Sequence, residues 1–452
     1  MASSEQRPAL VEQFGREFGR QPAWLVSAPG RINLIGEHTD YNGFAVMPMA
    51  IDRAIRIVAA PREDAQVELK DVARSLYDDR QFSLSRRIPP FAEGDWGNYA
   101  KAAVQSLVEL ALSDGGKAES LRGMSCLVDG DIPPAAGLSS STALVVAAGM
   151  AFGAVNWLSM GRRGLAERMA EAEHYVGTQG GGMDQAACLL AHKGHALKID
   201  FFPLRAEAVP FPNDFAILAA HSTISARKTG EQRLHYNRRV VECNIGAHLL
   251  ARHLDAAPPA HMADLAGPGG RPLAELRAAL EDVLKGHPSL SLRWGAALFG
   301  TDPGRFARKF LRMADGRLLP MPGDGLRVLQ RCRHVLTEAE RTERAAASLK
   351  GGDMRGLGEL MNESHQSCAQ DYEISCYELD QLVDLMRGAG ALGARLTGAG
   401  FGGFAIGLVR ADEAEQVKAA LERGFYAPRR IAAAQHLFLF QPADGALEEP
   451  LG

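Results

Sequence analysis

The chain has 452 residues, with 50 lysine and arginine residues against 54 aspartate and glutamate residues and a net charge of −4. This length is enough for two or three domains with sizeable hydrophobic cores. The balanced charge argues against a nucleic-acid-binding protein, because such proteins carry a basic surface.

Cysteine spacing and the N-terminal sequence both favour a cytoplasmic protein. The six cysteines show no CxxC spacing, so neither a zinc site nor a redox pair is indicated, and free thiols in a reducing compartment are expected. Residues 1–20 contain charged residues and no signal-peptide core. The apolar run at residues 143–155 is shorter than the roughly 20 residues that span a bilayer, so we expect a buried helix there. We therefore predict a cytoplasmic protein, most simply a monomer, with neither nucleic acid nor membrane as a partner.

Hydrophobic periodicity predicts helices and short strands in mixed order. The expected helices cover residues 9–21, 98–112, 143–158, 165–175, 238–253, 335–349, 356–367, 377–388 and 411–423. The expected strands cover residues 25–26, 45–60, 195–202, 215–221, 404–409 and 434–441. Residues 255–325 are richer in proline and glycine, and we interpret them as an insertion or a boundary region. The pattern favours an α+β fold over a regular βαβ series.

The first candidate site lies in the loop-like stretch of residues 31–42. It contains Arg31, Glu37, His38 and Asp40. Carboxylates and an imidazole suit hydrogen bonds to sugar hydroxyls, and the planar fork of arginine suits a phosphoryl oxygen. A solvated turn with local salt bridges is the alternative, although the interleaved aliphatic residues argue against full exposure.

A second candidate site precedes the apolar helix. Residues 137–142 read Gly-Leu-Ser-Ser-Ser-Thr. A helix that begins here directs its free N–H groups and its positive dipole end at the loop, which makes an anion site, and the serine hydroxyls add donors and a possible magnesium ligand. A serine-rich helix cap is the structural alternative. No GxxxxGK[ST] motif occurs, which argues against a P-loop NTPase.

Two further segments are rich in glycine. Residues 398–403 satisfy GxGxxG, but the sequence that follows is typical of a strand, so a dinucleotide-binding fold is rejected. A loop against a phosphate or the substrate, or a tight hairpin, remains open for that segment. Residues 180–182 are three glycines, which leave room for close approach to a ligand, and Asp184 follows them. An aspartate there can accept or orient the proton of an attacking hydroxyl, although it can equally serve as a turn residue or helix cap.

These segments together resemble the three signature motifs of the GHMP kinases. Residues 30–42 resemble the galactokinase signature almost residue for residue, and the similarity continues at residues 181–185, 235–243, 360–365 and 371–373. The resemblance implies a two-domain α+β fold with the active site in the cleft between the domains. Residues 1–205 would form a ribosomal-protein-S5-like domain. Residues 206–452 would form a ferredoxin-like domain with an insertion near 255–325.

The resemblance also implies an activity, namely ATP-dependent phosphorylation of the 1-hydroxyl of D-galactose. Asp184 would receive or orient the hydroxyl proton, and Arg31 would stabilise charge in the transition state. The sugar would contact these two residues and Glu37, His38, Asp40, Gly181 and Tyr236.

The same resemblance assigns residues to ATP and Mg²⁺. The phosphates would bind at Gly137, Leu138, Ser139, Ser140 and Ser141, and the Ser141 hydroxyl would help to coordinate Mg²⁺. Trp96 would lie beside the adenine, and Lys228 is a further candidate for the nucleotide or its phosphates.

Two alternatives remain at this stage. The triple glycine resembles the N-acetylgalactosamine kinase branch, whereas Thr39, Asn42 and Tyr236 match the galactose pattern. Some galactokinase-like proteins have lost residues from the serine loop and act only as sensors of galactose and ATP. No such deletion is visible here, which favours an enzyme.

Overall fold

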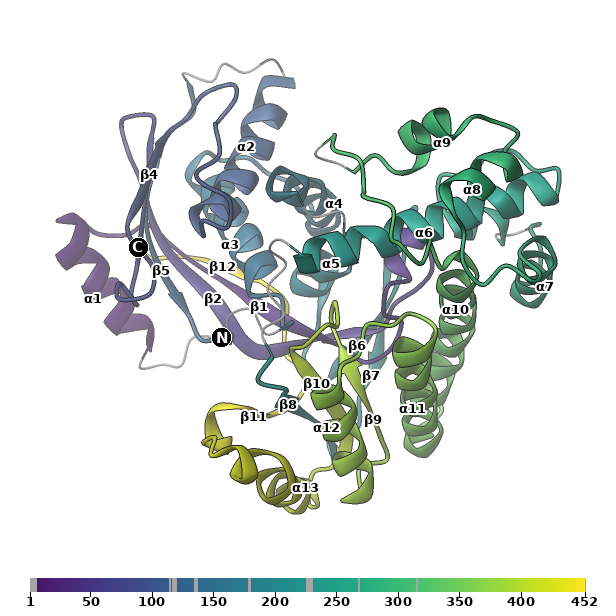
Figure 1. Ribbon diagram of the computed structural model, residues 1–452. Coiled ribbons are helices and arrows are strands. Elements are labelled where there is room, and N and C mark those ends of the chain that lie inside the picture. Colours follow the sequence, from purple (N-terminus) through teal and green to yellow (C-terminus); the bar gives the residue numbers. More distant parts are fainter. Residues whose placement is uncertain are drawn as a thin grey trace.

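The computed structural model describes residues 6–113, 115, 120–133, 137–177, 180–224, 231–266, 269–313 and 316–451 (Figure 1). Its helices are α1 (Gln6–Phe18), α2 (Gly97–Ser113), α3 (Ser140–Val155), α4 (Arg162–Ala172), α5 (Met183–Leu190), α6 (Glu231–His253), α7 (Leu273–Val283), α8 (Leu292–Leu298), α9 (Pro303–Phe310), α10 (Val328–Lys350), α11 (Met354–Gln370), α12 (Tyr377–Gly388) and α13 (Ala414–Leu421). Its strands are β1 (Trp24–Asn33), β2 (Pro48–Pro61), β3 (Gln66–Asp71), β4 (Arg80–Ser83), β5 (Met124–Gly130), β6 (His195–Asp200), β7 (Arg205–Pro210), β8 (Phe215–His221), β9 (Gly393–Thr397), β10 (Phe404–Arg410), β11 (Leu437–Phe440) and β12 (Leu447–Pro450). The predicted α+β class is confirmed.

The larger sheet has six strands in the order β12-β1-β2-β5-β3-β4, and only the β3–β5 pair is parallel. Side chains alternate between its two faces, as strand geometry requires. Leu25 and Val58 pack with α1 on one face, whereas Val26 and Ile57 belong to the main core together with residues of α2 and α3. Figure 1 shows α1 on the opposite side of the sheet from these two helices.

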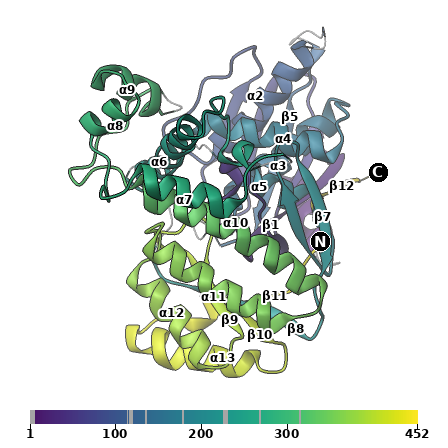
Figure 2. The same ribbon diagram turned by 90° about the vertical axis from the view of Figure 1, so that its right-hand side faces the viewer.

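The smaller sheet has four antiparallel strands in the order β11-β8-β10-β9. Side chains alternate between the two faces of β8. Ile217 therefore packs in the main core, whereas Leu218 packs in a second core with residues of α6, α12 and α13. Leu349 of α10 and Leu357 of α11 also belong to the main core. In Figure 2 these two helices run alongside each other across the middle of the molecule. The two sheets are therefore held together by one continuous apolar core.

Predicted and observed helices and strands agree best where the segment has a clear hydrophobic periodicity. Residues 215–221 and 377–388 coincide with β8 and α12. The prediction missed β3, β4, β5, β7, β9 and β12. Residues 31–42 were expected to be loop-like, but residues 31–33 are the end of β1 and pair with residues 48–50 of β2.

The predicted domain division stays a prediction, and two contacts bear on its placement. A boundary between residues 205 and 206 would separate β6 from β7, which pair as an antiparallel hairpin. At the other end of the chain, β12 returns to pair with β1 in the larger sheet. Residues 255–325 contain the short helices α7, α8 and α9, and their apolar side chains pack against α6 in the second core. None of the helices in the described ranges has the length and apolar character that a bilayer crossing requires.

Glu338 of α10 connects three parts of the fold and is fully buried. It accepts a hydrogen bond from the backbone N–H of Gly36 at 3.0 Å and another from the hydroxyl of Ser364, and it pairs with Arg341 at 2.7 Å. Burial alone would raise the pKa of this carboxyl, but Arg341 and the other positive neighbours lower it to about 2. The charge on Glu338 therefore stabilises the folded chain above pH 4.5, and this contribution is lost as the pH falls towards 2.

Replacing Glu338 with glutamine should destabilise the protein strongly, because Arg341 would lose its buried partner. We expect a loss of about 3 kcal/mol in the free energy of unfolding, measured by urea denaturation at pH 7. Glu340→Gln, on the same helix but with its side chain 39% exposed and 3.8 Å from Arg277, is the control and should change stability by less than about 0.5 kcal/mol. Equal urea midpoints for the two variants would contradict this account of Glu338.

Candidate active site

Arg31 and Asp184 form the centre of the site. Arg31 Nε donates to Asp184 Oδ1 at 2.7 Å, and Nη2 lies 2.6 Å from the same oxygen. Arg31 Nη1 donates to the carbonyl oxygen of Gly137 at 2.7 Å. Because Arg31 is only 4% exposed, this ion pair is screened less than a surface pair. The structure thus joins the two predicted catalytic residues, which are 153 positions apart in the chain.

The serine loop lies directly against this pair. The register of β1 shifts between Pro29 and Arg31, and a Cβ at Gly30 would lie 2.6 Å from the carbonyl oxygen of Leu138. The glycine therefore allows β1 and the loop to approach closely. Helix α3 begins at Ser140, as the anion-site interpretation requires. Ser139 makes no side-chain cap for this helix; its hydroxyl donates to Asp184 Oδ2 instead. The simple serine-cap alternative is therefore wrong for Ser139.

The glycine segment at residues 398–403 is the connection of a hairpin and also part of the site. It joins β9 to β10, which pair antiparallel, so the expected strand after the glycines is present. Gly398 has a φ of +83°, and a Cβ there would lie 2.9 Å from the carbonyl oxygen of Gly137. The hairpin interpretation therefore holds, and the turn packs on the serine loop. Contact of this turn with a phosphate or with the substrate stays a prediction.

The three consecutive glycines play different parts. A Cβ at Gly181 would lie 2.4 Å from the backbone nitrogen of Tyr41 and 2.5 Å from the carbonyl carbon of Asp40. Gly182 has a φ of +99° and precedes the first turn of α5. The predicted close approach at residue 181 is therefore to the Asp40 turn. Of these three glycines, only Gly180 has no atom of the described residues within 4 Å of an added Cβ.

Glu37 is fully buried beneath the site. Its Oε1 accepts the N–H of Gly398 at 2.9 Å and lies 3.3 Å from Nη1 of the buried Arg395. Burial raises the pKa of this carboxyl, although the charges of Arg395 and Arg31 act in the opposite direction. Glu37 therefore supports the glycine turn in addition to any contact with a ligand.

His38, Asp40 and Tyr236 stand around the same space. The ring centroids of His38 and Tyr236 lie 5.3 Å apart, so α6, which carries Tyr236, lies beside the segment of residues 31–42. Asp40 Oδ2 accepts the N–H of Gly181 at 3.1 Å. Burial raises the pKa of Asp40. The nearby Asp184 charge acts in the same direction, whereas hydrogen bonds from backbone N–H groups oppose the shift.

All seven predicted sugar-binding residues line one cavity of about 50 Å³, which has room for several water molecules. The sequence interpretation did not assign several other lining residues, namely Glu173, Gly180, Gly182, Met183, Gln185, Gly398 and Ala399. The glycine pattern was a signal for Gly398, but nothing in the sequence singled out Glu173. In the structure the Glu173 carboxylate accepts a hydrogen bond from the hydroxyl of the buried Thr142, which fixes Glu173 beside the start of α3.

The residues predicted to bind the nucleotide are spread more widely. The phenol of Tyr99, in the first turn of α2, lies near Ser141, so the start of α2 adjoins the serine loop. Trp96 precedes that helix, donates from Nε1 to the carbonyl of Asp78 at 3.0 Å, and does not line the cavity. Lys228 lies outside the described residues, so its prediction has no structural counterpart here.

A larger cavity of about 570 Å³ lies elsewhere, between the strands β1 and β2, the helices α4 and α5, and the segment before β12. No predicted site residue lines it. The chemistry therefore favours the smaller cavity, because the arginine, the aspartate and the helix terminus meet there.

Within the described ranges no group of three or more His, Cys, Asp or Glu side chains is arranged to hold a metal ion. Ser141, partly exposed at the start of α3, offers a hydroxyl oxygen beside the predicted phosphate site. An oxygen donor of this kind fits Mg²⁺, which usually keeps several waters and shares its coordination with substrate phosphates.

Family models and known proteins match most of the chain. Residues 12–61 match the galactokinase galactose-binding signature, residues 98–192 the GHMP kinase N-terminal domain, and residues 345–427 the GHMP kinase C-terminal domain. A curated galactokinase of Chloroflexus aggregans is 36% identical over 418 residues, covering 92% of this chain and 91% of the relative. A galactokinase of Dictyostelium discoideum is 29% identical, covering 97% and 92%.

A solved structure, the galactokinase of Lactococcus lactis complexed with galactose, matches with a TM-score of 0.78. It is 27% identical, and the match covers 98% of this chain and 99% of that one. A mevalonate kinase at 16% identity and a TM-score of 0.56 shares the fold. The chain therefore belongs to the galactokinase family of sugar kinases and has the two-domain GHMP kinase fold.

Proposed function

We propose that this enzyme transfers the terminal phosphoryl group of ATP to the 1-hydroxyl of D-galactose and gives α-D-galactose 1-phosphate. Membership of the galactokinase family supports the substrate pair. One observation in the structure carries the proposal further. Arg31 donates to both Asp184 and the carbonyl of Gly137, so a single cation ties the expected proton acceptor to the expected phosphate loop.

The hydrogen bonds of Asp184 suggest how its role begins. Oδ1 accepts from Arg31, and Oδ2 accepts from the Ser139 hydroxyl. A sugar hydroxyl entering the cavity would take the place of Ser139 at Oδ2. Its proton would then move to or be oriented by Asp184, while Ser139 turns its hydroxyl towards a phosphate oxygen. Positioning and electrostatics supply most of the rate enhancement in phosphoryl transfer, so Arg31 would stabilise the charge that develops.

ATP would lie with its phosphates at the start of α3. The free N–H groups and the dipole of this helix favour an anion, and Gly137, with a φ of +82°, gives the loop its sharp turn. Mg²⁺ would be held by the Ser141 hydroxyl together with phosphate oxygens, and when bound it neutralises phosphate charge. Trp96 beside the adenine and Lys228 near the nucleotide remain predictions.

We also propose that the enzyme acts in the cytoplasm as a monomer and has neither nucleic acid nor membrane as a partner. The six free cysteines and the balanced charge support this proposal.

Steady-state kinetics with MgATP test the substrate directly. We expect the purified, folded chain to have a higher kcat/KM for galactose than for N-acetylgalactosamine, because the described cavity is small and lined by polar groups that an acetamido group would displace. Release of ADP is the measured quantity. A folded protein that binds both ligands without releasing ADP would be a sensor, and a preference for N-acetylgalactosamine would reassign the substrate.

Asp184→Asn should lower kcat by about 100-fold or more, since the amide keeps the shape of the side chain but cannot accept the proton. Asp200→Asn is a matched control, because Asp200 is 46% exposed on its side chain and pairs with Lys198 outside the cavity. Calorimetric titration with galactose would establish that both variants still bind the sugar. Turnover of Asp184→Asn close to that of the parent enzyme would show that the role of Asp184 is assigned wrongly.

Arg31→Lys should reduce kcat more than it weakens ATP binding, because an ammonium group cannot reach Asp184 and the Gly137 carbonyl together. Arg62→Lys is the control. Arg62 makes a similar fork, donating to Asp64 at 2.7 Å from both Nε and Nη2, but it lies outside the cavity. The kcat and the ATP affinity of both variants are measured. An unchanged kcat for Arg31→Lys would show that Arg31 does not stabilise the transition state.

A further inference from the structure

A chain of hydrogen bonds runs from His38 away from the cavity. Its Nδ1 lies 2.9 Å from the hydroxyl of Tyr41, which lies 2.6 Å from the hydroxyl of Tyr372. The Tyr372 hydroxyl in turn lies 3.3 Å from Sγ of Cys243 on α6. Tyr372, fully buried, follows α11, so three distant segments of the chain meet behind one ring of the candidate sugar site.

The atoms that contact the His38 ring determine which group donates at each hydrogen bond of this series. Nε2 faces the carbonyl oxygen of Ala399 at 3.3 Å, and a carbonyl oxygen can only accept. In the neutral imidazole the proton is then on Nε2, and Nδ1 accepts from the Tyr41 hydroxyl. The Tyr41 hydroxyl oxygen then accepts a hydrogen bond from the Tyr372 hydroxyl, and the Tyr372 oxygen accepts one from the Cys243 thiol. Burial raises the pKa of both phenols well above the ordinary value, so they keep their protons.

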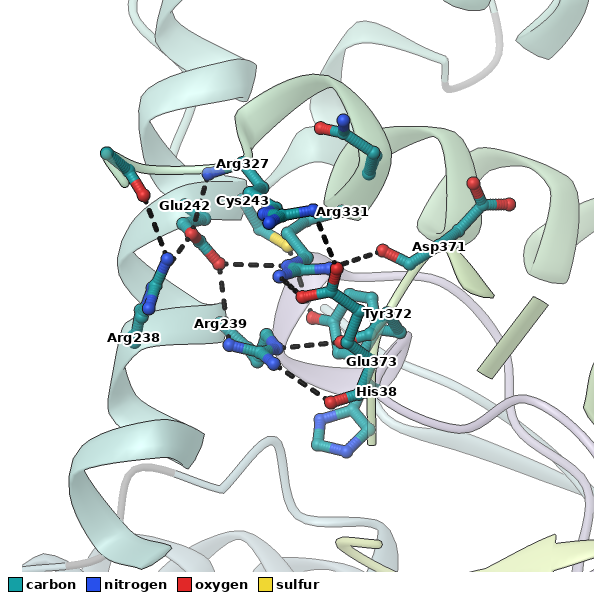
Figure 3. Close-up of polar contacts among 12 residues, drawn as sticks. His38, Arg238, Arg239, Glu242, Cys243, Arg327, Arg331, Asp371, Tyr372 and Glu373 are labelled. Atoms are coloured by element: carbon teal, nitrogen blue, oxygen red, sulfur yellow. Dashed lines mark hydrogen bonds and ion pairs between the residues drawn. The ribbon is translucent and has the colours of Figure 1, made fainter. Parts of the chain in front are cut away.

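Buried arginines hold Tyr372 in place, as Figure 3 shows. Arg239 of α6 donates to the carbonyl oxygens of Tyr372 and Glu373 at 2.8 and 3.0 Å. Arg331 of α10 donates to the carbonyl oxygen of Asp371 and to the carboxylate of Glu373. Three successive carbonyls are therefore gripped by charged donors, which fixes the backbone that carries the Tyr372 ring.

The ring of His38 is also confined sterically. Its centroid lies 4.8 Å from that of Tyr372 and 5.3 Å from that of Tyr236. The residue has a φ of +62°, in the left-handed region that residues other than glycine occupy uncommonly. Its carbonyl accepts a hydrogen bond from the Asn42 side chain at 2.9 Å. A residue in this conformation persists only where its surroundings determine it, which is typical of functional sites.

We propose that Tyr372 is a positioning residue of the sugar site: its hydroxyl, acting through Tyr41, holds His38 as the tautomer that carries its proton on Nε2. Because Ala399 and His38 both line the cavity, a sugar oxygen can replace the carbonyl as the acceptor of that proton. His38 then offers a donor, whereas the neighbouring Asp40 offers a carboxylate acceptor, and together they select a hydroxyl group that both donates and accepts. This inference rests on the proposed function in taking His38 as a sugar ligand.

Nitrogen NMR of the full chain labelled with ¹⁵N-histidine tests the tautomer without any assay of activity. The His38 signals are assigned by their loss in His38→Gln. We expect the unprotonated signature at Nδ1 of the neutral ring. A proton on Nδ1 in the unmodified protein would overturn the proposal, whether or not a variant at Tyr372 folds.

Tyr372→Phe removes the hydroxyl and keeps the ring. It should shift the His38 signals towards a mixture of tautomers and raise the KM for galactose by about three- to tenfold, the scale of one hydrogen bond, while kcat and the KM for ATP stay within about twofold. Tyr426→Phe is the matched control, because Tyr426 is also fully buried and donates to a backbone carbonyl, that of His221, at 2.8 Å. It should behave like the parent enzyme.

The outcomes separate the two proposals. Parent-like signals and galactose KM in Tyr372→Phe would overturn the positioning role, as would an equal change in Tyr426→Phe. Turnover of galactose by a protein whose His38 carries its proton on Nδ1 would contradict this inference alone. Absence of turnover with the proton on Nε2 would contradict the proposed function alone.

Discussion

The Arg31–Asp184 ion pair is the constraint on which the rest of the site depends. Arg31 is almost fully buried, so its charge needs partners that compensate for lost hydration. Asp184 and the carbonyl of Gly137 supply them, and these two partners belong to the start of α5 and to the loop before α3. Satisfying one buried cation therefore fixes the relative positions of β1, the serine loop and α5.

Close backbone contacts complete this arrangement. Gly30 lets β1 meet the serine loop, Gly181 lets the loop before α5 meet the Asp40 turn, and Gly398 lets the β9–β10 turn meet Gly137. Each of these positions would place a Cβ within 3.0 Å of a backbone atom. Four segments that are distant in the sequence, namely residues 30–41, the serine loop, the loop before α5 and the β9–β10 turn, thus contact one another, and all but the serine loop contribute residues that line the cavity.

Much of the fold could be predicted where a segment carries its own periodicity. The apolar run before residue 158 is one such case and is observed as α3 with its ends shifted by a few residues. The strand at 215–221 is another and coincides with β8. The strand β12, with the sequence Leu-Glu-Glu-Pro, was missed because nothing local marks it as a strand and only its pairing with β1 makes it one. The three residues 31–33 were assigned to a loop for the same reason, since their partners in β2 are distant in sequence.

The site likewise has features that the local sequence predicts and features that depend on distant residues. Its residue types were visible in the sequence, because carboxylates, an imidazole and an arginine cluster within short motifs. Their partners were not, because Arg395 beneath Glu37 and Tyr372 behind His38 come from parts of the chain more than 300 residues away. Packing of the two sheets on one core brings these residues together, and no local sequence pattern predicts that contact.

A crystal structure of the enzyme with galactose and a non-hydrolysable ATP analogue would show whether Arg31 and Asp184 meet both substrates. We expect the sugar 1-hydroxyl within hydrogen-bond distance of Asp184, Arg31 between that carboxylate and the terminal phosphate, and the phosphates at residues 137–141. Galactose bound elsewhere, for example in the larger cavity beside α4 and α5, or phosphates remote from the start of α3, would contradict it.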